Sequence, residues 1–280
     1  MFLHFFGYIF LFVSTISLLG QGFNNTYKSN NTLSKIYSGL AESVDWYDLP
    51  VFAAYLSRTA VYNSNLRSTI NIGPSYLDSE ISEDFGNSRN NSIGSMDKDL
   101  IPDYIFYSRL ALTAAADIFT DADISSKSFR QIFLFKKSLL YTYTLTEIVK
   151  NSITRNRPDN SDSRSFFSGH TATAFAASTF LYRELDDFYD KWDVTRADKK
   201  LRTTFKIASF GILYGWAGYV GYSRIYDKKH YLSDVITGAA VGTIISYFVY
   251  EHFNQKFPAL HNINLSTGNK SLFVSYKLDF

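Results

Sequence analysis

The sequence predicts an all-α fold, namely a single helical bundle followed by a short strand-like tail. Apolar residues recur at helical spacing in several stretches between residues 44 and 253, whereas apolar and polar residues alternate over residues 271–280. At 280 residues the chain can bury one substantial core, so we expect one domain with appendages rather than two equal domains.

The N-terminus has the pattern of an export signal. Residues 1–27 contain no Lys, Arg, Asp or Glu, and Phe5 to Leu19 is almost wholly apolar. We therefore expect a signal peptide over residues 1–22 and a chain exported to the periplasm or envelope. The alternative is an uncleaved N-terminal anchor, although the apolar segment is barely long enough to span a bilayer. Residues 23–44 follow as a linker, because their first part is rich in Asn, Ser and Thr.

The bundle itself is expected over residues 45–257. Leu49, Phe52 and Leu56 predict an amphipathic helix from about Val44 to Val61. Residues 62–104 are polar and rich in Gly and Asn, which indicates mostly a long surface loop. Helical patterns return over five later stretches: 105–119, 131–154, 170–187, 201–222 and 231–253.

The two most hydrophobic stretches are short for a bilayer span. Ile207 to Tyr222 and Val235 to Tyr250 have 16 residues each, so we interpret them as core helices of a soluble or peripheral bundle. Glycines recur in them at three- or four-residue spacing, which indicates close helix packing. These glycines are Gly211, Gly215, Gly218, Gly221, Gly238 and Gly242.

The C-terminal tail, residues 258–280, ends in a segment with period two. Leu272, Val274 and Tyr276 alternate with polar residues, which predicts a strand. It is similar to the closing strand of an outer-membrane barrel, but one strand cannot close a barrel. We therefore expect an edge strand or a tail docked on the bundle.

Composition excludes several classes of function. The chain has no cysteine, which rules out disulfide scaffolds, thiolate nucleophiles and Cys-based zinc sites. Its formal net charge is +2, and it contains no arginine-rich run and no Gly-rich phosphate loop. Nucleic acid is therefore not an expected partner, and the sequence does not indicate an oligomeric state.

Three segments carry the residue types that phosphate-ester cleavage requires: cations, a nucleophile and a proton donor. Lys150 and Arg157 are seven residues apart, so a helix running up to Arg157 would place both on one face. Pro158 disfavours helical geometry at Arg157, so the Arg157 guanidinium is expected at the helix end. Arg224 is the third candidate cation, and both guanidinium groups can engage two phosphate oxygens.

The second segment is Ser168-Gly169-His170, which precedes a helical run of small residues. Ser168 is expected to cap this helix, whose free N–H groups favour an anion. Gly169 lets the backbone approach a phosphate, and His170 is placed to donate a proton to the leaving oxygen. Taken alone, the segment would be interpreted as an ordinary helix start with an exposed histidine.

The third segment contains His230 and Asp234. They are four residues apart and are expected to stack on one helix face, where Asp234 would hold Nδ1–H and leave Nε2 as the attacking lone pair. Taken alone, they would be an ordinary helix pair. Lys229 could lower the pKa of His230, although we expect a solvated loop for Asp227-Lys228-Lys229.

Together these segments resemble the signature of the type 2 phosphatidic acid phosphatase (PAP2) superfamily, which includes bacterial class A acid phosphatases, lipid phosphate phosphatases and vanadium haloperoxidases. The matching motifs are Lys150-x6-Arg157-Pro158, Ser168-Gly169-His170 and Ser223-Arg224-x5-His230-x3-Asp234. Phe167 and Leu232 stand where the family usually has proline.

The resemblance implies a PAP2-type phosphatase domain over residues 45–257 that needs neither a metal nor another cofactor. It implies that His230 forms a phosphohistidine, that Asp234 orients it, and that His170 serves as acid and then as base. Three cations would bind the phosphate and two further residues would add hydrogen bonds: Lys150, Arg157, Arg224, Ser168 and Gly169.

The substrate is expected to be a phosphate ester, and by family analogy a lipid-linked phosphate or diphosphate met at a peripheral membrane contact. The aromatic content of 18% suits a lipid-binding cleft and a helical core equally well. Three alternatives stay open: a soluble acid phosphatase acting on small phosphomonoesters, a vanadium-dependent haloperoxidase and a non-catalytic envelope protein.

Overall fold

The structure is a computed structural model that describes residues 31–63, 70–87, 100–120, 124–254, 263–268 and 271–276. The expected signal peptide over residues 1–22 lies outside the described residues, as does the part of the expected linker before residue 31. Within the described ranges the chain is overwhelmingly helical, which confirms the all-α class.

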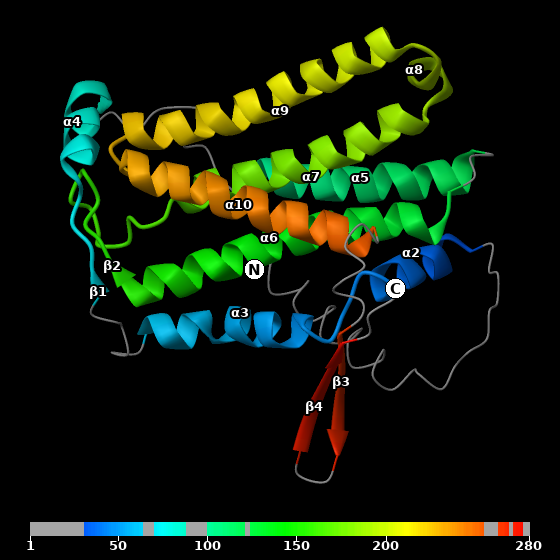
Figure 1. The fold of residues 1–280 in the computed structure, drawn as a ribbon, viewed down its shortest axis with the longest axis horizontal. Coiled ribbons are helices and arrows are strands. Elements are labelled where there is room, and N and C mark those ends of the chain that lie inside the picture. The colour runs from blue at the N-terminus through cyan, green and yellow to red at the C-terminus, as the bar shows by residue number, and fades with distance from the viewer. Residues whose placement is uncertain are drawn as a thin grey trace.

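The long helices lie side by side along the length of the molecule (Figure 1). In chain order they are α2 (Thr32–Ala41), α3 (Asp48–Asn63), α4 (Tyr76–Phe85), α5 (Leu100–Phe119), α6 (Ser126–Ser152), α7 (Gly169–Lys191), α8 (Asp193–Ala197), α9 (Lys199–Tyr226) and α10 (Leu232–Phe253). Two short strands, β1 (Ile70–Asn71) and β2 (Ile153–Thr154), pair in parallel and lie with α4 at one end of the bundle (Figure 1).

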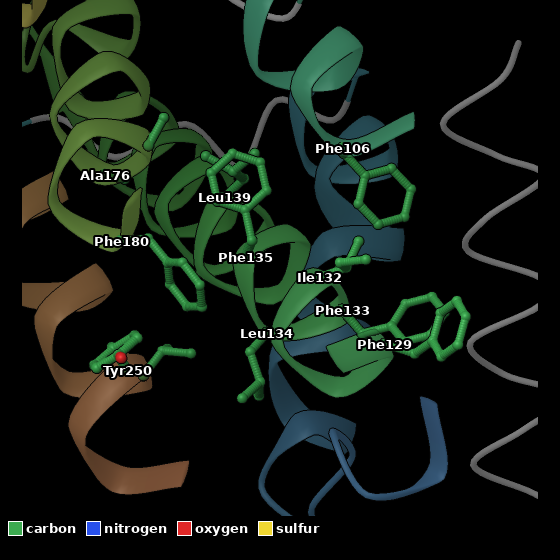
Figure 2. Close-up of a cluster of buried hydrophobic side chains, with 12 residues drawn as sticks. Phe106, Phe129, Ile132, Phe133, Leu134, Phe135, Leu139, Ala176, Phe180 and Tyr250 are labelled. Carbon is green, nitrogen blue, oxygen red and sulfur yellow. The ribbon is translucent and has the colours of Figure 1, made fainter. Parts of the chain in front are cut away.

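The core is centred on α6, which contacts α2, α3, α5, α7 and α10. Four aromatic side chains of this core, Phe106, Phe129, Phe135 and Phe180, are fully buried. Phe180 of α7 lies edge-on between Phe135 of α6 and Tyr250 of α10 (Figure 2). Edge-to-face packing of this kind adds to the free energy gained by removing the rings from water, so α6, α7 and α10 form one rigid unit.

Two expectations about irregular segments are wrong. Residues 32–41 of the expected linker form α2, because Asn31 caps the helix and Ile36 and Leu40 pack against the core. The expected loop over residues 62–104 contains α4, whose start is fixed by a capping box between Ser75 and Asp78. It also contains β1 and the first turn of α5, whereas residues 64–69 and 88–99 lie outside the described residues.

The expectation of a core helix is wrong for α9 and holds in part for α10, whose Val249 and Tyr250 belong to the core. In α9 the buried residues are confined to the last turns, from Ala217 onward. Ile207 and Ile212 of α9 are 67% and 74% exposed, and Ile244 of α10 is 66% exposed. Among the described helices, α10 alone is long and apolar enough to cross a membrane, which is weak evidence by itself.

The tail forms a hairpin rather than a lone strand. Strand β3 (Ile263–Gly268) pairs antiparallel with β4 (Ser271–Tyr276), with Ile263 opposite Tyr276. The expected strand is therefore confirmed over residues 271–276, and its partner is the tail itself. Residues 277–280 lie outside the described residues.

Close contact between α7 and α10 depends on two glycines of α10. A Cβ atom on Gly242 would lie 2.0 Å from the carbonyl oxygen of Ala172, and one on Gly238 would lie 2.6 Å from the carbonyl oxygen of Ser168. By contrast, a Cβ on Gly211, Gly215 or Gly218 of α9 would meet nothing within 4 Å among the described atoms. Close packing is thus confirmed for Gly238 and Gly242.

Gly242→Ala is expected to destabilise the protein, because the added methyl group would force α7 and α10 apart. Overpacking of this kind costs about 1–3 kcal/mol, and for a domain of this size each kcal/mol lowers the unfolding temperature by roughly 2–4 °C. The matched control is Gly218→Ala, which adds the same methyl group in open space. Thermal unfolding followed by circular dichroism checks this, and equal midpoints for the two variants would contradict the packing argument.

Candidate active site

The candidate residues lie where four helices end or begin, at the end of the bundle that also carries β2 (Figure 1). Lys150 is in the last turn of α6, and Arg224 is in the last turn of α9. Ser168 caps the start of α7, and Asp234 is in the first turn of α10. The fold therefore brings together segments that are up to 84 residues apart in the sequence.

Lys150 and Arg157 do not share a helix face, which corrects the sequence expectation. Helix α6 ends at Ser152, because the next two residues form β2 and Arg155 continues in an extended conformation paired with Arg164. Arg157 lies in the following loop, where its Nε donates to Asp162 Oδ1 at 2.7 Å. Lys150 Nζ would lie 3.7 Å from a Cβ on Gly169, so this ammonium group is next to the start of α7.

The start of α7 has the expected cap. Ser168 Oγ accepts hydrogen bonds from Thr171 N at 3.5 Å and Thr171 Oγ1 at 2.9 Å. The Ser168 N–H donates to the carbonyl oxygen of Asp234 at 3.1 Å, which ties the start of α7 to the start of α10. His170 is the second residue of α7 and is partly exposed, so its position is accessible to a ligand at this helix start.

Arg224 is buried at the end of α9, with 4% of its surface exposed. Burial lowers its pKa to about 10, with a further contribution from the positive charge of Arg157 and an opposing one from Asp227. A cation held in this way is an attractive site for an anion, because a bound anion would compensate the charge that burial disfavours. The carbonyl oxygen of Arg224 accepts from the N–H groups of Lys229 and His230, and so closes the turn that leads to His230.

His230 is buried, with 1% of its surface exposed, and it precedes α10 instead of lying on it. Its Nδ1 is 3.7 Å from Asp234 Oδ2, which is longer than a hydrogen bond, and no described residue hydrogen-bonds to that nitrogen. The expected stacking on one helix face is therefore wrong, although the two side chains are neighbours. The turn of residues 227–230 places His230 just before the helix.

Burial, helped by the positive charges of Lys150 and Arg157, lowers the pKa of His230 to about 3 against the opposing effect of Asp234. The imidazole is therefore neutral at ordinary pH, which is the state that a nucleophile requires.

Lys229 belongs to a tie between two loops, so the expected solvated loop is wrong for this residue. Its Nζ is 2.5 Å from Asp159 Oδ2, and the Asp159 N–H donates to the carbonyl oxygen of Lys228 at 3.1 Å. Asp159 follows Arg157 by two residues, and Lys229 immediately precedes His230. The tie therefore fixes the loop of one candidate cation against the loop of the candidate nucleophile.

Sequence reasoning missed the residues that hold Asp234. Arg155 Nη1 donates to Asp234 Oδ1 at 2.6 Å, and Ser165 Oγ donates to Asp234 Oδ2 at 2.5 Å. Asp78 of α4 in turn accepts from Arg155 Nη2 at 2.7 Å. The available signals were the capping-box spacing from Ser75 to Asp78 and the position of Arg155 two residues before Arg157, but neither predicts a contact across the fold.

The geometry suits capture of a phosphoryl group. The neutral imidazole of His230 is within the electrostatic influence of Lys150 and Arg157, the backbone N–H of His230 donates to the carbonyl oxygen of Arg224, and the capped start of α7 adds free backbone N–H groups. Within the described part of the chain, no three His, Asp or Glu side chains are grouped to hold a metal ion.

Comparison with known proteins gives one consistent family. Residues 133–258 match the model of the PAP2 superfamily. Over 148 residues the chain is 30% identical to a lipid A 1-phosphatase of Porphyromonas gingivalis, covering 47% of this chain and 29% of that protein. Over 120 residues it is 32% identical to a probable diacylglycerol pyrophosphate phosphatase of Schizosaccharomyces pombe, covering 41% of this chain and 37% of that protein. The chain thus spans less than two fifths of the length of these relatives.

A solved structure, the transmembrane PAP2 type phosphatidylglycerolphosphate phosphatase from Bacillus subtilis, aligns with 74% of this chain and 96% of its own, at a TM-score of 0.44 and 20% identity.

Proposed function

Because residues 133–258 match the model of the PAP2 superfamily, we propose that this protein is a phosphatase that hydrolyses phosphate esters without a metal, through a phosphohistidine intermediate. The observation that carries the proposal is the buried, neutral imidazole of His230 beside Lys150 and Arg157. A neutral imidazole has a lone pair for attack, and adjacent cations stabilise the charge on the phosphoryl oxygens in the transition state.

The first step forms a bond between His230 Nε2 and phosphorus and breaks the bond between phosphorus and the ester oxygen. His170 gives a proton to the leaving oxygen, so the alcohol departs neutral. Positive charge then develops on the His230 ring, and Asp234, 3.7 Å away at Oδ2, is placed to stabilise that charge through Nδ1–H.

The second step returns the enzyme to its starting state. His170, now neutral, takes a proton from a water molecule as that water attacks phosphorus, and the bond between phosphorus and Nε2 breaks. Inorganic phosphate leaves, His170 is again protonated and His230 is again neutral. In both steps Lys150, Arg157 and Arg224 hold the phosphoryl oxygens, and Ser168 and Gly169 hold them at the start of α7.

A lipid-linked phosphate or diphosphate is the substrate class we favour. Apolar side chains are exposed along α9 and α10, among them Ile207, Ile212, Ile236 and Ile244. An exposed apolar surface of this kind suits contact with a membrane, and the relatives include a lipid A 1-phosphatase and a probable diacylglycerol pyrophosphate phosphatase. We further propose that residues 1–22 direct export, which places the phosphatase domain, residues 45–257, in the periplasm or envelope at a membrane surface.

Phosphate release in excess EDTA tests the proposal, with a micellar lipid phosphate and p-nitrophenyl phosphate as paired substrates. We expect turnover of both in EDTA and a higher kcat/KM for the lipid. Loss of turnover in EDTA, restored by added metal, would contradict the metal-independent mechanism. A preference for the small ester by orders of magnitude would instead favour a soluble acid phosphatase.

A further inference from the structure

Arg155 is a buried cation that none of the proposed steps uses. Its side chain is 3% exposed and lies between two buried carboxylates, with Nη1 2.6 Å from Asp234 Oδ1 and Nη2 2.7 Å from Asp78 Oδ2. Nη1 also donates to Ser233 Oγ at 2.9 Å. Burying three charges is costly unless each is paired in good geometry, and removal of one partner leaves the others uncompensated.

The two oxygens of Asp234 have different neighbours. Oδ1 accepts from Arg155, whereas Oδ2 accepts from Ser165 Oγ at 2.5 Å and Tyr231 N at 2.9 Å and is the oxygen nearest His230 Nδ1. Arg155 thus occupies the oxygen that faces away from the imidazole. With Oδ1 held, the carboxylate cannot rotate, and Oδ2 stays directed toward His230.

From this arrangement we infer that Arg155, itself held by Asp78 of α4, is a positioning residue that fixes the Asp234 carboxylate for its work on His230. The inference rests on the proposed function, because it assigns a role within the same reaction. Arg155 acts through Asp234 and does not contact the phosphoryl group. It differs in this from Arg157, two residues later, which we assign to phosphate binding.

Asp78 has the contacts that a fixed anchor requires. It accepts from Ser233 N and Ser233 Oγ, both at 2.9 Å, and from Ser75 N at 3.1 Å. Burial raises its pKa, but the hydrogen bonds from Ser233, Ser75 and Arg155 outweigh burial and hold the pKa at about 2. Asp78 therefore stays ionised, and α4 is joined to the residue that directly precedes Asp234.

The pH dependence of kcat separates positioning from mere structural support. The active state needs a neutral His230 and an ionised Asp234, and protonation of either one removes activity on the acid side. The positive charge of Arg155 favours both of these states, so its loss raises the pKa values of His230 and Asp234. The acid limb, which is the fall of kcat at low pH, therefore moves to higher pH. The other charged groups that act on His230, namely Lys150 and Arg157, are left unchanged by the variants.

The test compares the full-length wild type with Arg155→Met and with the control Arg164→Met, assayed on p-nitrophenyl phosphate. Arg164 is paired with Arg155 in the extended segment, and its guanidinium forms an ion pair with Glu147 of α6 at 2.8 Å. For Arg155→Met we expect kcat to fall by about 10²-fold with KM nearly unchanged, because a misdirected reacting group costs about that much. We expect the midpoint of its acid limb to shift to higher pH by about one unit, whereas the control should keep the wild-type midpoint.

Two further variants keep the test decisive if Arg155→Met fails to fold. Arg155→Lys keeps the positive charge but lacks the planar guanidinium that hydrogen-bonds two carboxylates at once. Its acid limb should therefore lie at the wild-type pH while kcat stays reduced. Asp78→Asn removes a negative charge from the anchor, so kcat should fall while the acid limb does not rise. Its control is Asp84→Asn, an exposed position on the same helix.

Three outcomes would overturn the inference: wild-type kcat in Arg155→Met, a kcat loss that leaves the acid limb in place, or an acid-limb shift of the same size in Arg164→Met. These outcomes are distinguishable from failure of the proposed function. That proposal fails if His230→Ala remains active, whereas the inference fails if His230→Ala is inactive and the Arg155 variants behave as wild type.

Discussion

His230→Ala is expected to abolish phosphate release and to leave the fold intact. Removal of the attacking group eliminates the covalent pathway, and losses of roughly 10⁴-fold or more in kcat are usual for a nucleophile. The variant leaves a cavity in place of a fully buried side chain and so loses some stability, but no described residue loses a hydrogen bond to Nδ1. The measurement is phosphate release over a time course, with thermal unfolding as the control for folding.

A labelling experiment makes this prediction specific to His230. Wild-type enzyme quenched during turnover of a ³²P-labelled substrate should carry label that is stable to alkali and labile to acid, as expected for a phosphorus–nitrogen bond. His230→Ala should carry none, whereas His170→Gln should still become labelled. Label that persists in His230→Ala would assign the nucleophile to another residue.

Most helices and the set of candidate site residues could be derived from the sequence because both depend on local patterns. The apolar periodicity of α7 and α10 and the Ser168 cap are properties of short segments, and their elements were predicted within a few residues. The missed elements lack such patterns. Helix α4 buries Asp78 and Ser82 and exposes Tyr76, Leu77 and Phe85, so it has no buried apolar face, and Asp78 joins it to residues more than 70 positions away.

The geometry of the site could not be predicted, because it depends on where helices end. Lys150 and Arg157 suit one long helix by spacing, yet α6 ends at Ser152 where β2 begins to pair with β1. His230 and Asp234 suit one helix by spacing, yet α10 begins at Leu232. In each case a long-range contact overrides local helical preference. The burial that lowers the pKa of His230 is likewise a property of the whole fold.

The burial of α9 was mispredicted for a related reason. Hydrophobic composition alone does not distinguish a core helix from one that faces a membrane or another apolar surface. In the structure, α9 contacts α7 along one face and leaves Ile207 and Ile212 exposed. The close packing that glycines indicate is found at Gly238 and Gly242 of α10 and, near the end of α9, at Gly221, where a Cβ would lie 3.0 Å from Val235 Cγ1.

His170→Gln is expected to reduce turnover by an amount that depends on the leaving group. General acid catalysis contributes about 10²–10⁴-fold when the leaving oxygen is basic. An alkyl phosphate should therefore lose most of its turnover already in the first step. With p-nitrophenyl phosphate the departing phenolate needs little protonation, so His230 is still phosphorylated, and only the second step lacks its base.

The measurable consequence is a burst. His170→Gln mixed with p-nitrophenyl phosphate should release about one equivalent of nitrophenol per enzyme and then proceed slowly, because the phosphohistidine accumulates. The double variant His170→Gln with His230→Ala should show no burst, which ties the burst to the nucleophile. Equal losses on alkyl and nitrophenyl esters without a burst would show that His170 neither protonates the leaving oxygen nor activates water. Its position in the first turn of α7 would then serve only to bind the phosphate.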